Sequence, residues 1–244
     1  MMTKRDVLLD RMERIGRSVA EKDGTLMLLA LGSIGQETER LDEYSDLDFF
    51  LIVEDGQKAR FIDRLDWLEV EPLHYQFQNT KDGHKIMYHD GIYGEFAVFE
   101  LHEMATIAYT PGRVVWRRDK ALEVFATPRL EITRESADYY YEEALTNLYV
   151  GLLRERRGEM LAGFELVQVA AVQNVLKALG GQGDPFNPTR RVESRHPKMI
   201  SFLLGGVLGY GKSGVAAAAI LRLIEARYEV NATMKREIER LLET

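Results

Sequence analysis

The chain has 244 residues, of which 45% are apolar and 29% are charged, and its formal net charge is −7. This length allows one large domain or two modest ones, and the acidic balance disfavours nonspecific binding to nucleic acid. The sequence contains no cysteine, which excludes disulfides and thiolate metal sites and is typical of a reducing compartment.

The first half of the chain predicts an α+β unit. Apolar residues at helical spacing indicate an amphipathic helix over residues 4–22, and Phe61, Leu65 and Leu68 mark a second helix. Charges scattered through the N-terminal segment argue against a signal peptide, and no uncharged apolar run reaches the roughly 18 residues of a membrane span. A cytoplasmic protein without membrane contact is therefore expected. The apolar runs predict strands over residues 25–31, 44–53, 73–77, 84–89 and 92–101, with a hairpin turn at Asp90-Gly91.

After about residue 130 the pattern becomes helical. The Leu-, Ala- and Tyr-rich segments predict helices over residues 135–157, 159–179, 214–228 and 231–243, interrupted by an irregular loop over 182–197. We place the boundary near Ala126-Thr127-Pro128. The predicted domains are residues 1–128, of mixed α and β structure, and residues 129–244, an all-helical bundle.

Two carboxylates precede the apolar run Phe-Phe-Leu-Ile-Val. Asp46 and Asp48 are two residues apart, so in a strand they point the same way, roughly 6–7 Å apart. Like charges at this separation are costly unless a cation lies between them. Gly32-Ser33 ends the preceding strand, where a short helix is predicted to start and to offer amides and a hydroxyl to phosphate oxygens. Carboxylate and phosphate oxygens together suit Mg²⁺.

This pattern resembles the nucleotidyltransferase superfamily that includes DNA polymerase β and the antibiotic nucleotidyltransferases. Gly32, Ser33, Asp46 and Asp48 match its signature of an apolar strand, Gly-Ser and Asp-x-Asp in a second apolar strand. The segment around Ile-Tyr-Gly-Glu-Phe is similar to the lincosamide nucleotidyltransferases, in which Arg-Gly-Glu-Phe carries a third acid. Here Tyr93 replaces the arginine. The resemblance implies a polymerase β-like mixed-sheet domain followed by the helical bundle.

The resemblance also implies an enzyme and its site. Asp46, Asp48 and Glu95 would bind two Mg²⁺ ions, and Gly32 and Ser33 would bind the triphosphate of ATP or another nucleoside triphosphate. Glu95 would also serve as general base. The transferred group would be a nucleoside monophosphate, and the acceptor a hydroxyl of a small antibiotic such as a lincosamide or aminoglycoside, with release of pyrophosphate. A role in antibiotic resistance follows as an expectation.

A second glutamate competes with Glu95 for the third position. Glu100 lies on the same predicted strand at an odd separation, so only one of the two can face Asp46 and Asp48. Gly94 allows close approach of a ligand next to Glu95, and the resemblance also favours Glu95. Glu95 is therefore the predicted ligand.

Several alternatives remain open. The acceptor could be a protein hydroxyl, as in nucleotidyltransferase antitoxins, or the protein could be a non-catalytic nucleotide-binding module; Asp46 and Asp48 could also be an acidic strand edge in solvent. The sequence does not name the acceptor, the base preference or the oligomeric state, and a homodimer is left open. The roles of Arg190, Arg191, Arg195 and Lys198 are likewise open, between contact with the triphosphate and pairing with nearby acids.

One further motif is interpreted as incidental. Residues 206–213, Gly-Val-Leu-Gly-Tyr-Gly-Lys-Ser, match the P-loop pattern. A P-loop fold needs further parallel strands and a later acidic strand, whereas the remaining residues predict two helices. A glycine-rich turn between helices is the preferred interpretation. The five histidines form no metal-spaced pair on a predicted helix.

Overall fold

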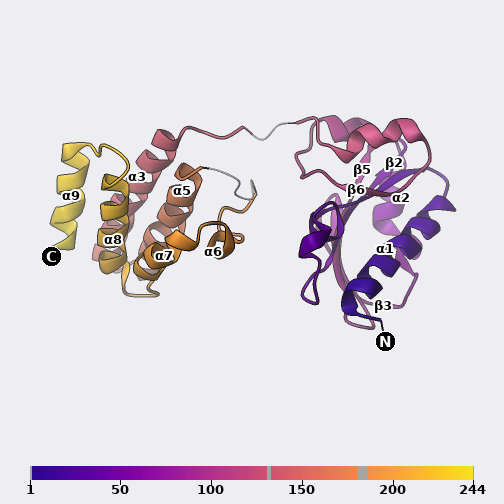
Figure 1. The fold of residues 1–244 in the computed structure, drawn as a ribbon, viewed down its shortest axis with the longest axis horizontal. Helices are drawn as coiled ribbons and strands as arrows, with labels where there is room; N and C mark the ends of the chain where they lie inside the picture. Colours follow the sequence, from indigo (N-terminus) through magenta and orange to yellow (C-terminus); the bar gives the residue numbers. More distant parts are fainter. Residues whose placement is uncertain (1, 131–132, 181–185, 244) are drawn as a thin grey trace. The chain divides into compact units, whose positions relative to one another are not determined.

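A computed structural model of the chain describes residues 2–130, 133–180 and 186–243. The chain divides into two units, Met1–Ile132 and Thr133–Thr244, which are drawn in Figure 1. The domain boundary predicted between residues 128 and 129 stays a prediction, because a domain is a part of the chain that folds independently. The expected fold class is confirmed, because a mixed sheet is followed by a helical region.

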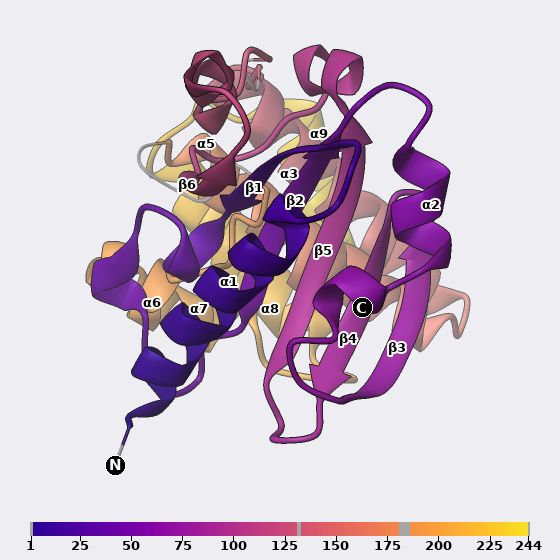
Figure 2. The same cartoon turned by 90° about the vertical axis from the view of Figure 1, so that its right-hand side faces the viewer.

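The first unit is built on a six-stranded mixed sheet of order β3-β4-β5-β2-β1-β6, which Figure 2 shows from the side of α1. Strands β2 and β5 are parallel, and the other neighbouring pairs are antiparallel. The elements are α1 (Lys4–Ala20), β1 (Thr25–Ala30), β2 (Leu47–Val53), α2 (Lys58–Asp63), β3 (Leu73–Thr80), β4 (Gly83–Tyr88), β5 (Tyr93–Glu100) and β6 (Arg113–Arg117).

Helices α1 and α2 lie on the same side of this sheet (Figure 2). Helix α1 starts at a capping box, in which the Asp6 amide donates to the Thr3 hydroxyl at 3.2 Å. Its residues Leu8, Met12 and Ile15 are fully buried against the inward side chains of the strands. Each such side chain contributes about 1.5–3 kcal/mol on burial, so this face forms the main core of the unit.

The opposite face of the sheet is covered by residues 101–126, which follow β5. Phe50 of β2 makes edge-to-face ring contacts with Phe99 of β5 and with Tyr109, at centroid distances of 4.9 Å and 5.6 Å. The Tyr109 hydroxyl donates to the Phe125 carbonyl at 2.7 Å. These contacts involve the C-terminal halves of β2 and β5. On the same face, the N-terminal ends of both strands carry the predicted acids.

Apart from the turn after Gly32, one predicted element of this unit is wrong and one strand was not predicted. The single helix expected around Phe61 and Leu68 is two short segments, α2 and a 3₁₀ turn at Asp66–Leu68, separated by extended backbone at Arg64. The indole of buried Trp67 donates to the Phe61 carbonyl at 3.1 Å, which stabilises this break. Strand β6 was not predicted, because its five residues alternate weakly and are all half-buried beside β1.

The second unit is helical, as predicted. Its helices are α3 (Ala137–Arg156), α4 (Met160–Phe164), α5 (Ala171–Ala178), α6 (Val192–Arg195), α7 (Ile200–Gly206), α8 (Ser213–Glu225) and α9 (Ala232–Leu242). Part of the loop predicted over 182–197, residues 181–185, lies outside the described residues, and α6 occupies the end of that range. None of the helices in the described ranges has the length and apolar content needed to cross a membrane.

The helix predicted over 159–179 contains a π-helical turn, Glu165–Ala170, between α4 and α5. This turn carries Gln168, which is 2% exposed. The Gln168 carboxamide oxygen accepts from the amides of Leu208 and Gly209 at 2.7 Å and 2.9 Å, and its nitrogen donates to the Gly209 carbonyl at 2.8 Å. The π-helical turn, with its extra residue, thus contains the side chain that binds the glycine-rich loop.

That loop is the segment that matches the P-loop pattern. It connects helix α7 to helix α8, whereas a P-loop follows a strand. The amides of Leu208 and Gly209, which a phosphate would need, bind Gln168 instead. Lys212 is exposed at the start of α8. The interpretation as a turn between helices is confirmed.

We expect Gln168→Leu to lower the free energy of unfolding by about 1–3 kcal/mol, because it removes the acceptor of the Leu208 and Gly209 amides and the donor to the Gly209 carbonyl. Urea unfolding followed by circular dichroism measures this change. Gln173→Leu is the matched control on the same helix, at a half-buried position, and should change the unfolding free energy by less than about 0.5 kcal/mol. Equal effects of the two substitutions would show that Gln168 does not hold the loop.

Candidate active site

The sheet brings Asp48 and Glu95 face to face. Strands β2 and β5 pair in parallel with Asp48 directly opposite Glu95, so the two side chains project to the same face of adjacent strands, whose backbones are about 4.8 Å apart. Asp46 comes two residues before Asp48 and is exposed, whereas Asp48 and Glu95 are half-buried. Asp48 and Glu95 therefore share one face at the N-terminal ends of β2 and β5, and Asp46 lies just before β2, which begins at Leu47.

Gly32 and Ser33 lie on the other side of Asp48, at the end of β1. The Leu31 amide donates to the Asp48 carbonyl at 2.7 Å, which aligns the end of β1 with Asp48. A Cβ atom added to Gly32, whose φ is +56°, would lie 3.6 Å from a carboxylate oxygen of Asp48. The Gly-Ser turn thus adjoins the acids, as the motif predicts.

The helix expected after Gly32 is instead a single 3₁₀ turn, Gly32–Ile34. The chain folds back on itself at Gly35, where a Cβ would meet backbone atoms of Ala30 and Leu31 at 2.8–2.9 Å, and this ends the turn. The site consequently lacks the dipole of a long helix. Binding of phosphate here would depend on the turn amides and on the Ser33 hydroxyl.

Polar neighbours surround Glu95 on its other side. Lys85 lies opposite Glu95 on β4, with a separation of 3.8 Å between Nζ and a carboxylate oxygen, and the Asn79 amide donates to Glu95 at 3.1 Å. Both members of the Lys85–Glu95 pair are over a third exposed, so this pair is weak and can yield to a metal ion. Burial raises the pKa of Tyr93, and the charges of Glu95 and Asp46 raise it further, which places its phenol among the acids.

The donor set suits magnesium. Asp46, Asp48 and Glu95 offer carboxylate oxygens, the ligands that Mg²⁺ prefers. Their oxygens do not all lie within 4.8 Å of one another in the described chain. Because Mg²⁺ keeps several waters and is commonly held by one or two carboxylates together with substrate phosphates, this spacing is compatible with binding.

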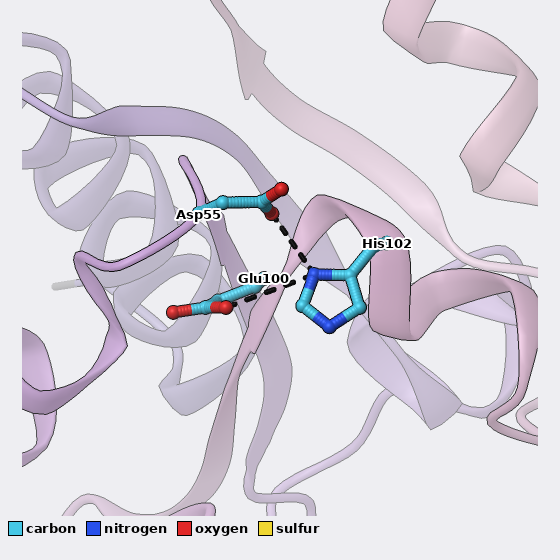
Figure 3. Close-up of side chains that lie close together, drawn as sticks. All are labelled: Asp55, Glu100 and His102. Carbon is cyan, nitrogen blue, oxygen red and sulfur yellow. Dashed lines mark hydrogen bonds and ion pairs between the residues drawn. The ribbon is translucent and has the colours of Figure 1, made fainter.

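A different group of ligand-type side chains does converge. Among the described residues, Asp55, Glu100 and His102 bring their ligand atoms within 4.8 Å of one another, at the C-terminal ends of β2 and β5 (Figure 3). His102 Nδ1 lies 3.0 Å from Asp55 and 3.7 Å from Glu100, and the Gly56 amide donates to Glu100 at 2.8 Å. Sequence analysis missed this group, since no spacing in the sequence links its members.

Ion pairing accounts for this second group. The hydrogen bond with Asp55 raises the pKa of His102, and burial opposes this only in part, which favours the protonated imidazolium. The side chains of His102 and Asp55 are 64% and 69% exposed, as expected for a surface ion pair.

A polar cavity of about 1020 Å³ lies beside β3, lined by residues 73–76 and Gln78 of that strand, by five residues between positions 65 and 72, and by Arg14, Ile62, Asp63 and His84. None of the predicted site residues lines it. The cavity and the acids are therefore separate features of the first unit.

The comparisons with known proteins give distant similarities. No family model matches the chain, and no curated protein matches it. A nucleotidyltransferase-like protein from Exiguobacterium sibiricum 255-15 is 12% identical, with a TM-score of 0.39 over 95% of this chain and 74% of that chain. An aminoglycoside 6-adenyltransferase from Bacillus subtilis is 13% identical, with a TM-score of 0.31 over 100% of both chains. A STING-associated c-di-GMP synthase from Capnocytophaga granulosa is 12% identical, with a TM-score of 0.34 over 98% of this chain and 78% of that chain.

The first two descriptions name the kind of protein that the sequence resembles. All three TM-scores are below 0.5, so these similarities carry no argument about activity. Evidence about activity therefore comes from the acids and the Gly32-Ser33 turn of this chain.

Proposed function

We propose that the protein is a Mg²⁺-dependent nucleotidyltransferase. It transfers a nucleoside monophosphate, AMP when ATP is the donor, to a hydroxyl of a small molecule and releases pyrophosphate. ATP and Mg²⁺ are both abundant in the cytoplasm, the compartment expected from the sequence.

The observation that carries this proposal is the direct pairing of Asp48 with Glu95 across β2 and β5, with Asp46 at the same end. The acids come from segments far apart in the sequence, and they lie next to the Gly32-Ser33 turn. Carboxylates can hold divalent cations, and a neighbouring turn with a hydroxyl side chain can bind phosphate oxygens. Metal-assisted attack on a phosphate requires both. The turn at Asp55-Gly56 that adjoins the group of Asp55, Glu100 and His102 carries no hydroxyl side chain, and its Gly56 amide donates to Glu100.

In this proposal, phosphate binding takes place on one side of Asp48 and proton transfer on the other. Ser33 and the turn amides would bind the β- and γ-phosphates, and Asp46, Asp48 and Glu95 would hold the Mg²⁺ ions. Two divalent ions bound there would supply positive charge to the attacking and the leaving oxygen. The acceptor oxygen forms a bond to the α-phosphorus, the bond from this phosphorus to the β-phosphate oxygen breaks, and Glu95 takes the acceptor's proton. Pyrophosphate leaves.

We further propose that the acceptor is a small molecule, with lincosamide and aminoglycoside antibiotics as the first candidates and antibiotic resistance as the corresponding role. This choice comes from the sequence resemblance around Glu95. A protein hydroxyl is the main alternative acceptor, and a module that binds nucleotide without catalysis is the second.

Mass spectrometry of an acceptor panel incubated with ATP and Mg²⁺, combined with an assay for pyrophosphate, tests the proposal. The expected result is an acceptor that gains the mass of one AMP, with stoichiometric pyrophosphate and no product when EDTA is present. Release of ADP or orthophosphate would indicate a different reaction. AMP attached to protein would identify the protein-hydroxyl alternative, and ATP binding without any product would identify the non-catalytic one.

A further inference from the structure

The face of the sheet that carries the acids continues across β4 to the edge strand β3. Register places Phe77 opposite Lys85, and Lys85 opposite Glu95, in a row that ends at Asp48. Residues directly opposite one another in neighbouring strands project to the same face. Phe77, Lys85, Glu95 and Asp48 therefore form one line across four strands.

A second line runs parallel to the first. Register places Tyr75 opposite Met87, and Met87 opposite Tyr93, which lies two residues before Glu95 on β5 and so projects to the same face. Tyr75 and Phe77 are 50% and 52% exposed, and Met87 is 39% exposed. We call Tyr75, Phe77 and Met87 the β3–β4 ledge. Large apolar side chains exposed together on one surface mark a binding site.

The strand order sets the direction from which an acceptor must come. The Gly32-Ser33 turn follows β1, on one side of Asp48, and Glu95 and the ledge lie on the opposite side, in the order β5, β4, β3. In-line displacement requires the attacking oxygen to approach opposite the leaving pyrophosphate. If the turn holds the pyrophosphate, the acceptor approaches over Glu95, and the rest of the acceptor extends over the ledge.

The ledge also constrains the chemistry of the acceptor. Strand β3, Leu-His-Tyr-Gln-Phe-Gln-Asn-Thr, contains no lysine, arginine, aspartate or glutamate. Lys85 is the charged side chain between Phe77 and Glu95. Aromatic rings and a methionine bind apolar ring faces well, whereas the ledge itself offers a polycation no carboxylate to pair with. The nearest acids, Glu95 and Asp48, lie beyond Lys85 and are the ones assigned to the metal ions.

We propose that the β3–β4 ledge binds the acceptor, and that the acceptor is a small neutral or singly charged molecule with an apolar ring face next to its reacting hydroxyl. This inference rests on the proposed function and narrows it, since it favours lincosamide-like acceptors over polycationic aminoglycosides. The spacing of strands puts Phe77 about 10 Å from Glu95, two strand spacings away, which matches a molecule of one or two rings.

Saturation-transfer NMR with lincomycin and kanamycin as probes tests the ledge without turnover when Mg²⁺ and α,β-methylene-ATP are present, because the α–β bridge of this analogue cannot be cleaved. The test variant is Tyr75→Thr/Phe77→Thr, which removes both rings and keeps residues that favour a strand. The matched control is Gln76→Thr/Gln78→Thr, which changes two exposed residues on the opposite face of the same strand. ATP affinity is measured separately for all three proteins by isothermal titration.

We expect lincomycin to bind the wild type and the control equally and to bind the ledge variant at least about tenfold more weakly, which corresponds to roughly 1.4 kcal/mol. The saturation-transfer signal of kanamycin should be the same for the wild type and the ledge variant. Lack of lincomycin binding to the wild type, or equal binding to all three proteins, would overturn the inference; so would a change of oligomeric state in the ledge variant, which would assign the ledge to a second copy of the chain. If the wild type does not bind ATP, the proposed function is contradicted. The comparison of lincomycin binding among the three proteins stays valid in that case.

Discussion

Asp48→Asn is expected to reduce nucleotidyl transfer by at least about a thousandfold in kcat, equivalent to roughly 4 kcal/mol of transition-state stabilisation. The amide keeps the shape of the side chain but removes the negative charge that would hold a divalent cation. The fold should persist with an unchanged or slightly raised unfolding midpoint, because the substitution also removes one of three neighbouring like charges. Pyrophosphate release at saturating Mg²⁺ measures the first effect and urea unfolding the second.

The matched control is Asp55→Asn. Asp55 follows the opposite end of the same strand, is 69% exposed and pairs with His102 on the surface. Its loss should change turnover by less than about threefold, since an exposed pair of this kind contributes little. Near-normal turnover of Asp48→Asn at saturating Mg²⁺ would contradict the metal-binding role, and a large loss in Asp55→Asn would move the metal site to the other end of the sheet.

Glu95→Gln is expected to cost at least about a thousandfold in kcat, again roughly 4 kcal/mol, with nucleotide affinity largely kept. Glu95 lies opposite Asp48 and on the side from which the acceptor approaches, so its carboxylate can both complete the metal site and take the proton. Glutamine can do neither. Single-turnover measurements separate this loss in the chemical step from changes in nucleotide binding and product release.

Glu100→Gln is the control for this prediction and should cost less than about tenfold in kcat. Glu100 pairs in register with Val53 at the far end of β2, roughly 16 Å along the strand from Glu95, and accepts a hydrogen bond from the Gly56 amide at 2.8 Å. The Glu100 side chain therefore stabilises the loop at Gly56. The reverse order of damage would assign catalysis to the group of Asp55, Glu100 and His102.

The sequence by itself determined the features that depend on neighbouring residues. Apolar runs placed β1 and β2, and the positions of Gly32 and Asp48 beside them followed from the ends of those runs. Helical periodicity predicted α3, α8 and α9 to within a few residues. The interpretation of Lys212 in a turn between helices also followed, because the residues after it have helical and not strand periodicity.

The tertiary structure decided how these parts meet. The position of Glu95, and not Glu100, opposite Asp48 depends on the parallel register of β2 with β5, which are separated by α2, β3 and β4 along the chain. The single 3₁₀ turn after Gly32 depends on the close return of the chain at Gly35. The π-helical turn depends on the hydrogen bonds of Gln168 to a loop from another part of the second unit.

These features share one physical reason. Strand register and the contacts of a buried polar side chain are set by packing and hydrogen bonding between segments that are remote in sequence, whereas periodicity reports only which face of one segment is apolar. For the same reason the β3–β4 ledge could not be inferred from the sequence. Tyr75, Phe77 and Met87 are ordinary apolar residues of two predicted strands until the order β3-β4-β5-β2 aligns them with Glu95 and Asp48.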